Sequence, residues 1–187
     1  MNPIIVTGAP YSGTSVVARL LQTRIDIVMD EGPLRTDAFK PLGYYEDHKL
    51  IEINKIAYSY ILARIGTNCG KVPAQWAIGF ASWLAYRDGK YSKWGWKDPG
   101  AVAMAKHIHQ FVDNPTWIVC QRKDEQIIKS QVEKGGFPKE IAKQGLIAYN
   151  TLIKRELKDK CVHFVLSEWR SEKNIVEELQ GILNGRC

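Results

Sequence analysis

The sequence lacks several patterns that mark particular classes of protein. It has no apolar run of the roughly 18 residues that a membrane-spanning helix needs, and its first residues turn polar too early for a secretory signal. Its four cysteines are scattered, without the C-x-x-C spacing of zinc or dithiol sites. Lysine and arginine are spread along the chain instead of forming a basic run. We therefore expect a cytoplasmic protein with reduced cysteines, no zinc centre, and no membrane or nucleic-acid partner.

What is present is the composition of an ordinary globular protein. The 187 residues are 45% hydrophobic and 25% charged, which argues against disorder and against fibrous folds. No internal repeat, low-complexity tract or linker divides the chain, so we expect a single domain over residues 1–187. The formal net charge of +6 suits an anionic ligand.

Hydrophobic periodicity alternates between strand-like and helix-like segments along the chain. The expected strands are Ile4–Thr7, Ile25–Met29, Trp94–Lys97, Trp117–Gln121 and Val162–Leu166. The expected helices are Thr14–Thr23, Asp47–Ile65, Ala74–Tyr86, Ala101–Val112, Lys123–Lys134, Pro138–Leu157 and Lys173–Leu183. This alternation predicts an α/β fold, with a mostly parallel sheet of four or five strands flanked by helices. Ligands of such sheets bind at the carboxyl ends of the strands.

The first strand end carries the most informative motif. Ile4–Thr7 runs into the turn GAPYSGTS at residues 8–15 and then into an amphipathic helix. Such a junction directs backbone N–H groups and the positive end of a helix dipole at one point, as phosphate-binding loops do. Gly8 and Gly13 have P-loop spacing, which predicts a three-layer P-loop NTPase-like fold, but Thr14 replaces the NTPase lysine. We therefore expect the chain to bind a phosphorylated nucleotide without using it as ATP.

The other strand ends are also polar. Lys97 and Asp98 follow one predicted strand, and Arg122 follows another, with Ser130 on the next predicted helix. Arginine has a planar fork that matches phosphate oxygens, and serine adds a neutral donor. Arg122 and Ser130 are therefore expected to hold a single phosphate from two sides.

In this order the motifs resemble the P-loop-like sulfotransferases that use 3′-phosphoadenosine 5′-phosphosulfate (PAPS). The matching segments are Val6–Ser15, Gly43–Asp47, Gly95–Pro99, the Arg122/Ser130 pair and Val165–Glu168. The resemblance implies transfer of the sulfuryl group from PAPS to a hydroxyl or amine of a small-molecule or glycan acceptor, without a metal. The product would be adenosine 3′,5′-bisphosphate (PAP). By the same resemblance, the donor would be bound by Pro10, Tyr11, Ser12, Gly13, Thr14, Ser15, Arg122 and Ser130.

The catalytic residues follow the same resemblance, with one departure. Family members usually carry Lys or Arg immediately before Ser-Gly-Thr, where this chain has Tyr11. Tyrosine donates a hydrogen bond but brings no positive charge to the departing phosphate. Lys97 or Arg19 would then supply the charge. Glu46 is the first candidate for the general base and Asp98 the second, so the expected catalytic group is Tyr11, Glu46, Lys97 and Asp98.

Two other functions stay open. A P-loop kinase acting on a nucleoside or metabolite would share the loop, but it would need the lysine that Thr14 replaces. A nucleotide-binding or partner-binding module that has lost catalysis would account for Tyr11. No readable motif identifies the acceptor, whose pocket we expect to be built by the segments Asp30–Tyr45 and Gly66–Tyr91.

Overall fold

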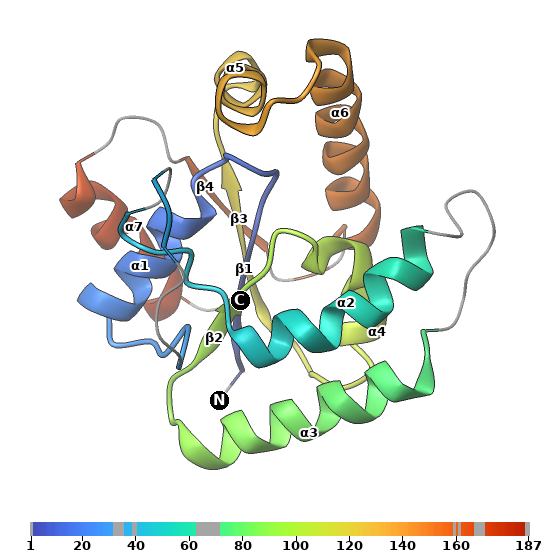
Figure 1. Cartoon of the computed structure of the whole chain (residues 1–187). Helices are drawn as coiled ribbons and strands as arrows, with labels where there is room; N and C mark the ends of the chain where they lie inside the picture. The colour runs from blue at the N-terminus through green and yellow to red at the C-terminus, as the bar shows by residue number, and fades with distance from the viewer. Residues whose placement is uncertain are drawn as a thin grey trace.

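The computed structural model describes residues 2–31, 36–38, 41–62, 72–158, 160, 162–166 and 171–185. These residues contain four strands, β1 (Ile4–Thr7), β2 (Gly95–Lys97), β3 (Thr116–Gln121) and β4 (Val162–Leu166). The helices are α1 (Thr14–Arg24), α2 (His48–Leu62), α3 (Ala74–Lys90), α4 (Ala105–Ile108), α5 (Asp124–Gly135), α6 (Lys139–Glu156) and α7 (Glu172–Asn184), with a 3₁₀ turn η1 (Ala101–Met104). All strands pair in parallel in the order β2-β1-β3-β4, and helices lie on both faces of the sheet (Figure 1). The predicted α/β class is confirmed.

β1 is an inner strand of the sheet. Its four residues, Ile-Ile-Val-Thr, are all buried, as a parallel strand covered on both faces requires. Ile5 is in register with Trp96 of β2 on one side and with Trp117 of β3 on the other. The loop after β1 therefore leaves the carboxyl edge of the sheet between the ends of β2 and β3.

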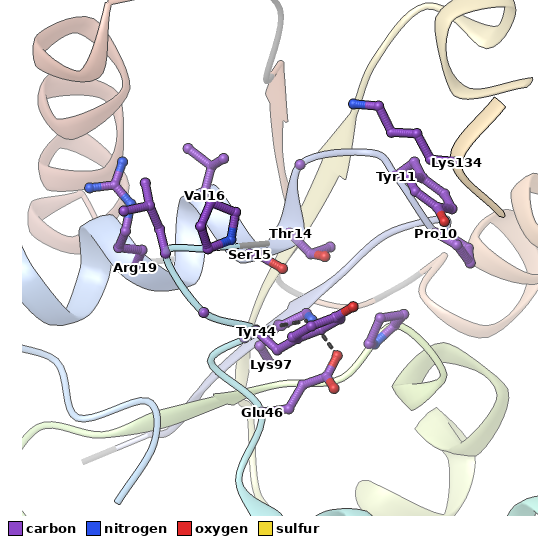
Figure 2. Close-up of a pocket in the computed structure, with 15 residues that line it drawn as sticks. Pro10, Tyr11, Thr14, Ser15, Val16, Arg19, Tyr44, Glu46, Lys97 and Lys134 are labelled. Carbon is purple, nitrogen blue, oxygen red and sulfur yellow. Dashed lines mark hydrogen bonds and ion pairs between the residues drawn. The ribbon is translucent and has the colours of Figure 1, made fainter. Parts of the chain in front are cut away.

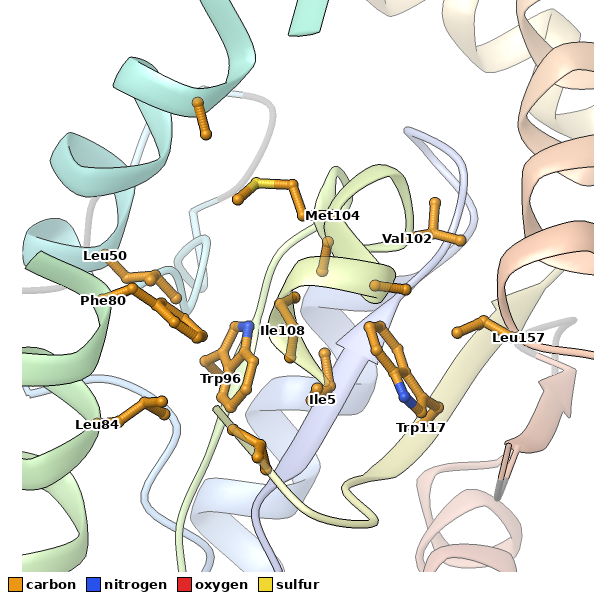
Figure 3. Packing of buried hydrophobic residues seen from close by; sticks show 14 of the residues in the cluster. Ile5, Leu50, Phe80, Leu84, Trp96, Val102, Met104, Ile108, Trp117 and Leu157 are labelled. Atoms are coloured by element: carbon orange, nitrogen blue, oxygen red, sulfur yellow. The ribbon is translucent and has the colours of Figure 1, made fainter. Parts of the chain in front are cut away.

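The two faces of the sheet are covered by cores of different composition. On one face, α2, α3, η1, α4 and α6 enclose a cluster rich in aromatic residues, where Ile5 lies between Trp96 and Trp117 (Figure 3). On the other face, α1 and α7 pack aliphatic side chains such as Leu20 and Leu179 against Ile4 and Val6. Burial of side chains of this size stabilises each face by about 1.5–3 kcal/mol per residue. The packed helices on both faces thus fix the position of the sheet edge from which the loops extend.

A buried arginine joins α3 to the sheet. The Arg87 side chain is fully buried and donates to the Val28 carbonyl oxygen at 2.7 Å and to the Gly95 carbonyl oxygen at 3.0 Å. It also forms ion pairs with Glu31 at 3.0 Å and with Asp47 at 3.4 Å. Because it is hydrogen-bonded and paired, this charge can remain in the aromatic core. Arg87 is therefore a structural residue that fixes the start of α2 relative to β2.

Two expectations about the fold are wrong. Ile25–Met29 is not a strand, because Asp26 takes a left-handed φ of 60° and only Val28 forms a bridge, to Trp94. The predicted helix Ala101–Val112 is divided into η1 and the short α4. The described part of Gly66–Tyr91 is mostly α3, which packs Trp76 and Phe80 into the core and lines a separate cavity of about 670 Å³ with α2, and its role in binding an acceptor stays a prediction.

Two further points concern the sequence expectations. Ser167 and Glu168, which end the last matching segment, lie outside the described residues. Within the described ranges, no helix combines the length and apolar character needed to cross a bilayer.

Candidate functional site

The loop after β1 has the backbone of a phosphate-binding turn. Tyr11 and Gly13 take positive φ angles of 70° and 100°, and the Ser12 N–H donates to the Ala9 carbonyl oxygen at 2.9 Å. A β-carbon on Gly8 would lie 2.7 Å from the Cys120 carbonyl oxygen, so no larger residue fits there. Gly13 is the N-cap residue directly before α1. The N–H groups in the first turn of a helix have no carbonyl partner within that helix. These amides are suited to bind an anion above the loop.

A tyrosine that the sequence analysis missed holds the base of this loop. The Tyr149 hydroxyl on α6 accepts from the Gly8 N–H at 2.9 Å and donates to the Pro99 carbonyl oxygen at 2.7 Å. It also lies 2.8 Å from the Thr7 hydroxyl. Burial raises the pKa of Tyr149, so the hydroxyl keeps its proton. One side chain thus joins the end of β1, the loop and the segment after β2.

A cavity of about 530 Å³ opens beside the loop (Figure 2). It is lined by the loop and α1, by the segment before α2, by the end of β2 and by the end of α5. The lining residues are Pro10, Tyr11, Gly13, Thr14, Ser15, Val16, Arg19, Pro41, Leu42, Gly43, Tyr44, Glu46, Lys97, Pro99 and Lys134. Of the predicted loop residues, Ser12 is absent from this lining, because it is fully buried beneath the turn. The predicted acceptor segment Asp30–Tyr45 contributes to the cavity, whereas no described residue of 72–91 does.

Two of the predicted catalytic residues form an ion pair in this cavity. Lys97 Nζ contacts Glu46 Oε1 and donates to the Tyr44 carbonyl oxygen at 3.2 Å. The Lys97 side chain is fully buried, and that of Glu46 is 15% exposed. The structure therefore brings the predicted base and the predicted cation together, and much of the charge of each is balanced by the other.

Asp98 is turned away from this cavity. Its carboxylate accepts hydrogen bonds from Asn54 Nδ2 at 2.7 Å, from the Gly100 N–H at 2.8 Å and from the Tyr58 hydroxyl. Removal of water raises the pKa of Asp98, although these donors act in the opposite direction. Asp98 lines a neighbouring cavity of about 190 Å³, with α2. This position suits a residue that fixes the turn after β2 better than a general base.

Arg122 and Ser130 are in contact, and their joint binding of a phosphate stays a prediction. Arg122 Nη1 lies 3.4 Å from Ser130 Oγ, and Arg122 Nε donates to Gln126 Oε1 at 2.6 Å. The neighbouring Gln131 donates from Nε2 to the Pro10 carbonyl oxygen at 3.1 Å. α5 therefore carries both the Arg122 partner and a direct link to the loop. Arg122 lines a separate cavity of about 490 Å³ between β3, α5 and α6.

The cavity beside the loop has two further cations. Arg19 on α1, already named as a possible source of charge, pairs with Glu172 of α7. Lys134, in the last turn of α5, was missed because it belongs to none of the matching motifs, although it follows Ser130 by only four residues. Figure 2 shows Lys134 beside Tyr11 at the rim of the cavity.

Comparison with known proteins supports the fold and goes no further. No protein-family model and no curated protein matches the sequence. A shikimate kinase from Bacteroides thetaiotaomicron is similar over 98% of both chains, with a TM-score of 0.59 and 10% identity. A sulfotransferase domain from the curacin biosynthetic pathway has a TM-score of 0.60 and 14% identity over 98% of this chain and 71% of that one. A deoxyadenosine kinase from M. mycoides with bound dATP has a TM-score of 0.51 and 14% identity over 97% and 99%.

The chain shares its P-loop NTPase-like fold with these kinases and this sulfotransferase domain. Identities this low establish the fold alone, because one fold serves many chemistries. The function of the chain therefore has to be argued from the residues of its site.

Proposed function

We propose that this protein is a sulfotransferase that uses PAPS as donor and a hydroxyl or amine of a small molecule or glycan as acceptor. The observation that carries the proposal is the contact between Arg122 Nη1, just after β3, and Ser130 Oγ on α5, which are 3.4 Å apart. α5 is in turn bonded to the loop through Gln131. The loop and the Arg122/Ser130 pair, the two proposed anion-binding groups, are thereby held in a fixed position relative to each other. PAPS needs two such groups because it carries a 3′-phosphate as well as its 5′-phosphosulfate, whereas ATP carries its phosphates at the 5′ position.

In this proposal the loop amides and Thr14 hold the 5′-phosphosulfate, and Arg122 with Ser130 holds the 3′-phosphate. The acceptor oxygen or nitrogen attacks sulfur, and the bond between sulfur and the bridging phosphate oxygen breaks. PAP leaves with that bond's electron pair. Glu46 lines the cavity and takes the proton of the acceptor, once the bound donor draws Lys97 toward its own negative charge.

The site favours sulfuryl transfer over the kinase alternative in two respects. Thr14 stands where P-loop kinases place the lysine that binds the β- and γ-phosphates. A P-loop kinase also needs an aspartate at a strand end to hold magnesium. Asp98, which follows β2, instead directs its carboxylate to Asn54, Tyr58 and Gly100. ATP turnover that depends on magnesium would favour the kinase. Binding of PAP with no transfer to any acceptor would favour a module that has lost catalysis.

Titration calorimetry without magnesium tests the donor assignment. We expect PAP to bind at least about 10-fold more tightly than ADP, the scale of one additional charged hydrogen bond. Arg122→Ala should cost about 2–4 kcal/mol of PAP binding, and Ser130→Ala about 1 kcal/mol. Lys129→Ala is the matched control, because Lys129 is exposed on the same helix, pairs with Glu133 at 3.8 Å and carries the same charge. If Arg122→Ala bound PAP as tightly as the parent and the control, the 3′-phosphate assignment would be wrong.

A further inference from the structure

We propose that Lys134 is a further catalytic residue, which contacts the 5′-phosphate of the donor and supplies the positive charge that Tyr11 cannot. This inference rests on the proposed sulfotransferase function and adds to it a cation that no loop motif encodes. Lys134 comes from the last turn of α5, a helix separated from the loop by more than a hundred residues.

The balance of charge around the cavity selects Lys134. Among the residues that the structure describes, three cations line it, namely Arg19, Lys97 and Lys134. Arg19 pairs with Glu172 and Lys97 with Glu46, so part of each charge is already balanced. Lys134 is exposed and forms no ion pair with any residue in the described part of the chain. It is therefore the lining cation that is best able to respond to an incoming anion.

The end of α5 is built to bring Lys134 to the loop. Gln131 Nε2 donates to the Pro10 carbonyl oxygen at 3.1 Å, and Gly136 ends the helix with a left-handed φ of 69°. A β-carbon on Gly135 would lie 3.1 Å from the Tyr11 hydroxyl, so the absence of a side chain lets Tyr11 pack against the helix end. Tyr11 and Lys134 are consequently side by side at the cavity rim (Figure 2). The long lysine side chain can reach the space above the loop from there.

The chemistry requires a cation at this point. When the bond between sulfur and the bridging oxygen breaks, its electron pair passes to the 5′-phosphate of PAP. The negative charge on that phosphate therefore increases in the transition state. An ammonium group stabilises such a charge more strongly than a neutral hydroxyl does. Lys134 keeps its proton throughout, since the acceptor proton goes to Glu46.

A comparison of two nucleotides tests Lys134 without an acceptor. Adenosine 3′-monophosphate has the 3′-phosphate but not the 5′-phosphate, so it cannot contact Lys134 in the proposed way. Lys134→Gln should weaken PAP binding about 10-fold and leave binding of adenosine 3′-monophosphate unchanged. Lys134→Arg should keep PAP affinity, and Lys129→Gln on the same helix is the control. Tyr11→Lys added to Lys134→Gln should restore PAP binding by returning the charge through the loop.

Sulfate release from PAPS to water is the second readout. This reaction transfers the sulfuryl group to a water oxygen and yields PAP and sulfate. Lys134→Gln should lower its rate further than it lowers PAP affinity, because the contact strengthens in the transition state. Unchanged PAP binding in Lys134→Gln, or an equal loss for both nucleotides, would refute the role of Lys134 and leave the proposed function standing. A parent protein that bound neither nucleotide would refute the proposed function itself.

Discussion

Tyr149→Phe removes one oxygen atom and should loosen the loop after β1. The hydroxyl accepts from the Gly8 N–H at 2.9 Å, lies 2.8 Å from the Thr7 hydroxyl and donates to the Pro99 carbonyl oxygen at 2.7 Å. In the variant, the Thr7 hydroxyl still donates to the Pro99 carbonyl oxygen at 3.2 Å. The buried Gly8 N–H, however, loses its acceptor.

The cost follows from that single unsatisfied donor. A buried N–H without a partner destabilises a protein by about 1–3 kcal/mol. For a chain of this size each kcal/mol lowers Tm by about 2–4 °C, so the expected loss is roughly 2–12 °C. PAP binding should weaken as well, because the loop amides are then held less firmly. Thermal unfolding and calorimetry on the same samples measure both effects.

Tyr86→Phe is the matched control. The Tyr86 hydroxyl also makes two hydrogen bonds, to Glu31 at 2.9 Å and with Lys90 at 2.6 Å, but it lies at the surface of α3. Its loss should change stability by less than about 0.5 kcal/mol, since water replaces the partners. If Tyr149→Phe were as stable as Tyr86→Phe and bound PAP equally well, Tyr149 would not be holding the loop.

Three further predictions concern charge and metal. Lys97→Met should destabilise the fold by about 1–3 kcal/mol in urea unfolding, because it leaves the Glu46 carboxylate without its partner, and Glu46→Gln should recover part of the loss. Burial lowers the pKa of His109, whose Nε2 accepts from Trp117 Nε1 at 3.2 Å. The neutral form is therefore favoured by folding, so stability is full above about pH 6.5 and falls as the pH drops below it, less steeply in His109→Gln. Sulfuryl transfer should survive EDTA, and loss of turnover that magnesium restores would contradict the proposed function.

Local patterns in the sequence are enough to predict most of the fold. The buried run of β1, the glycines at 8 and 13 and the amphipathic α1 all agree with one another, and such consistency makes elements predictable. The prediction of a strand at Ile25–Met29 was wrong because the apolar residues of this segment pack against a helix instead of forming a run of strand pairs. Ile27 and Met29 pack beneath α1, and pairing with β2 is confined to Val28, whose carbonyl oxygen accepts from the Gly95 N–H at 3.0 Å and from Arg87 at 2.7 Å.

That Arg122 and Ser130 hold a phosphate stays a prediction, but their proximity was predictable, because eight residues separate a strand end from a position on the next helix. Contacts between distant segments were not. Lys97 and Asp98 are adjacent in sequence, yet successive side chains of an extended segment point to opposite sides. Lys97 consequently meets Glu46 in the cavity, and Asp98 meets Asn54 of α2. Tyr149 enters the site only because α6 packs beside the sheet, an arrangement that no local pattern encodes.

The order of the strands also has a consequence for the synthesis of the protein. β1 leaves the ribosome before its partners β2 and β3, which end at Lys97 and Gln121. Parallel pairing over such separations is slow, and an unpaired apolar strand is prone to associate with other chains. A nascent chain that stops before residue 116 therefore contains every residue of the loop after β1 but lacks β3, one of the two strands between which that loop leaves the sheet. The loop after β1 is thus synthesised well before the strand β3 that lies beside it in the folded protein.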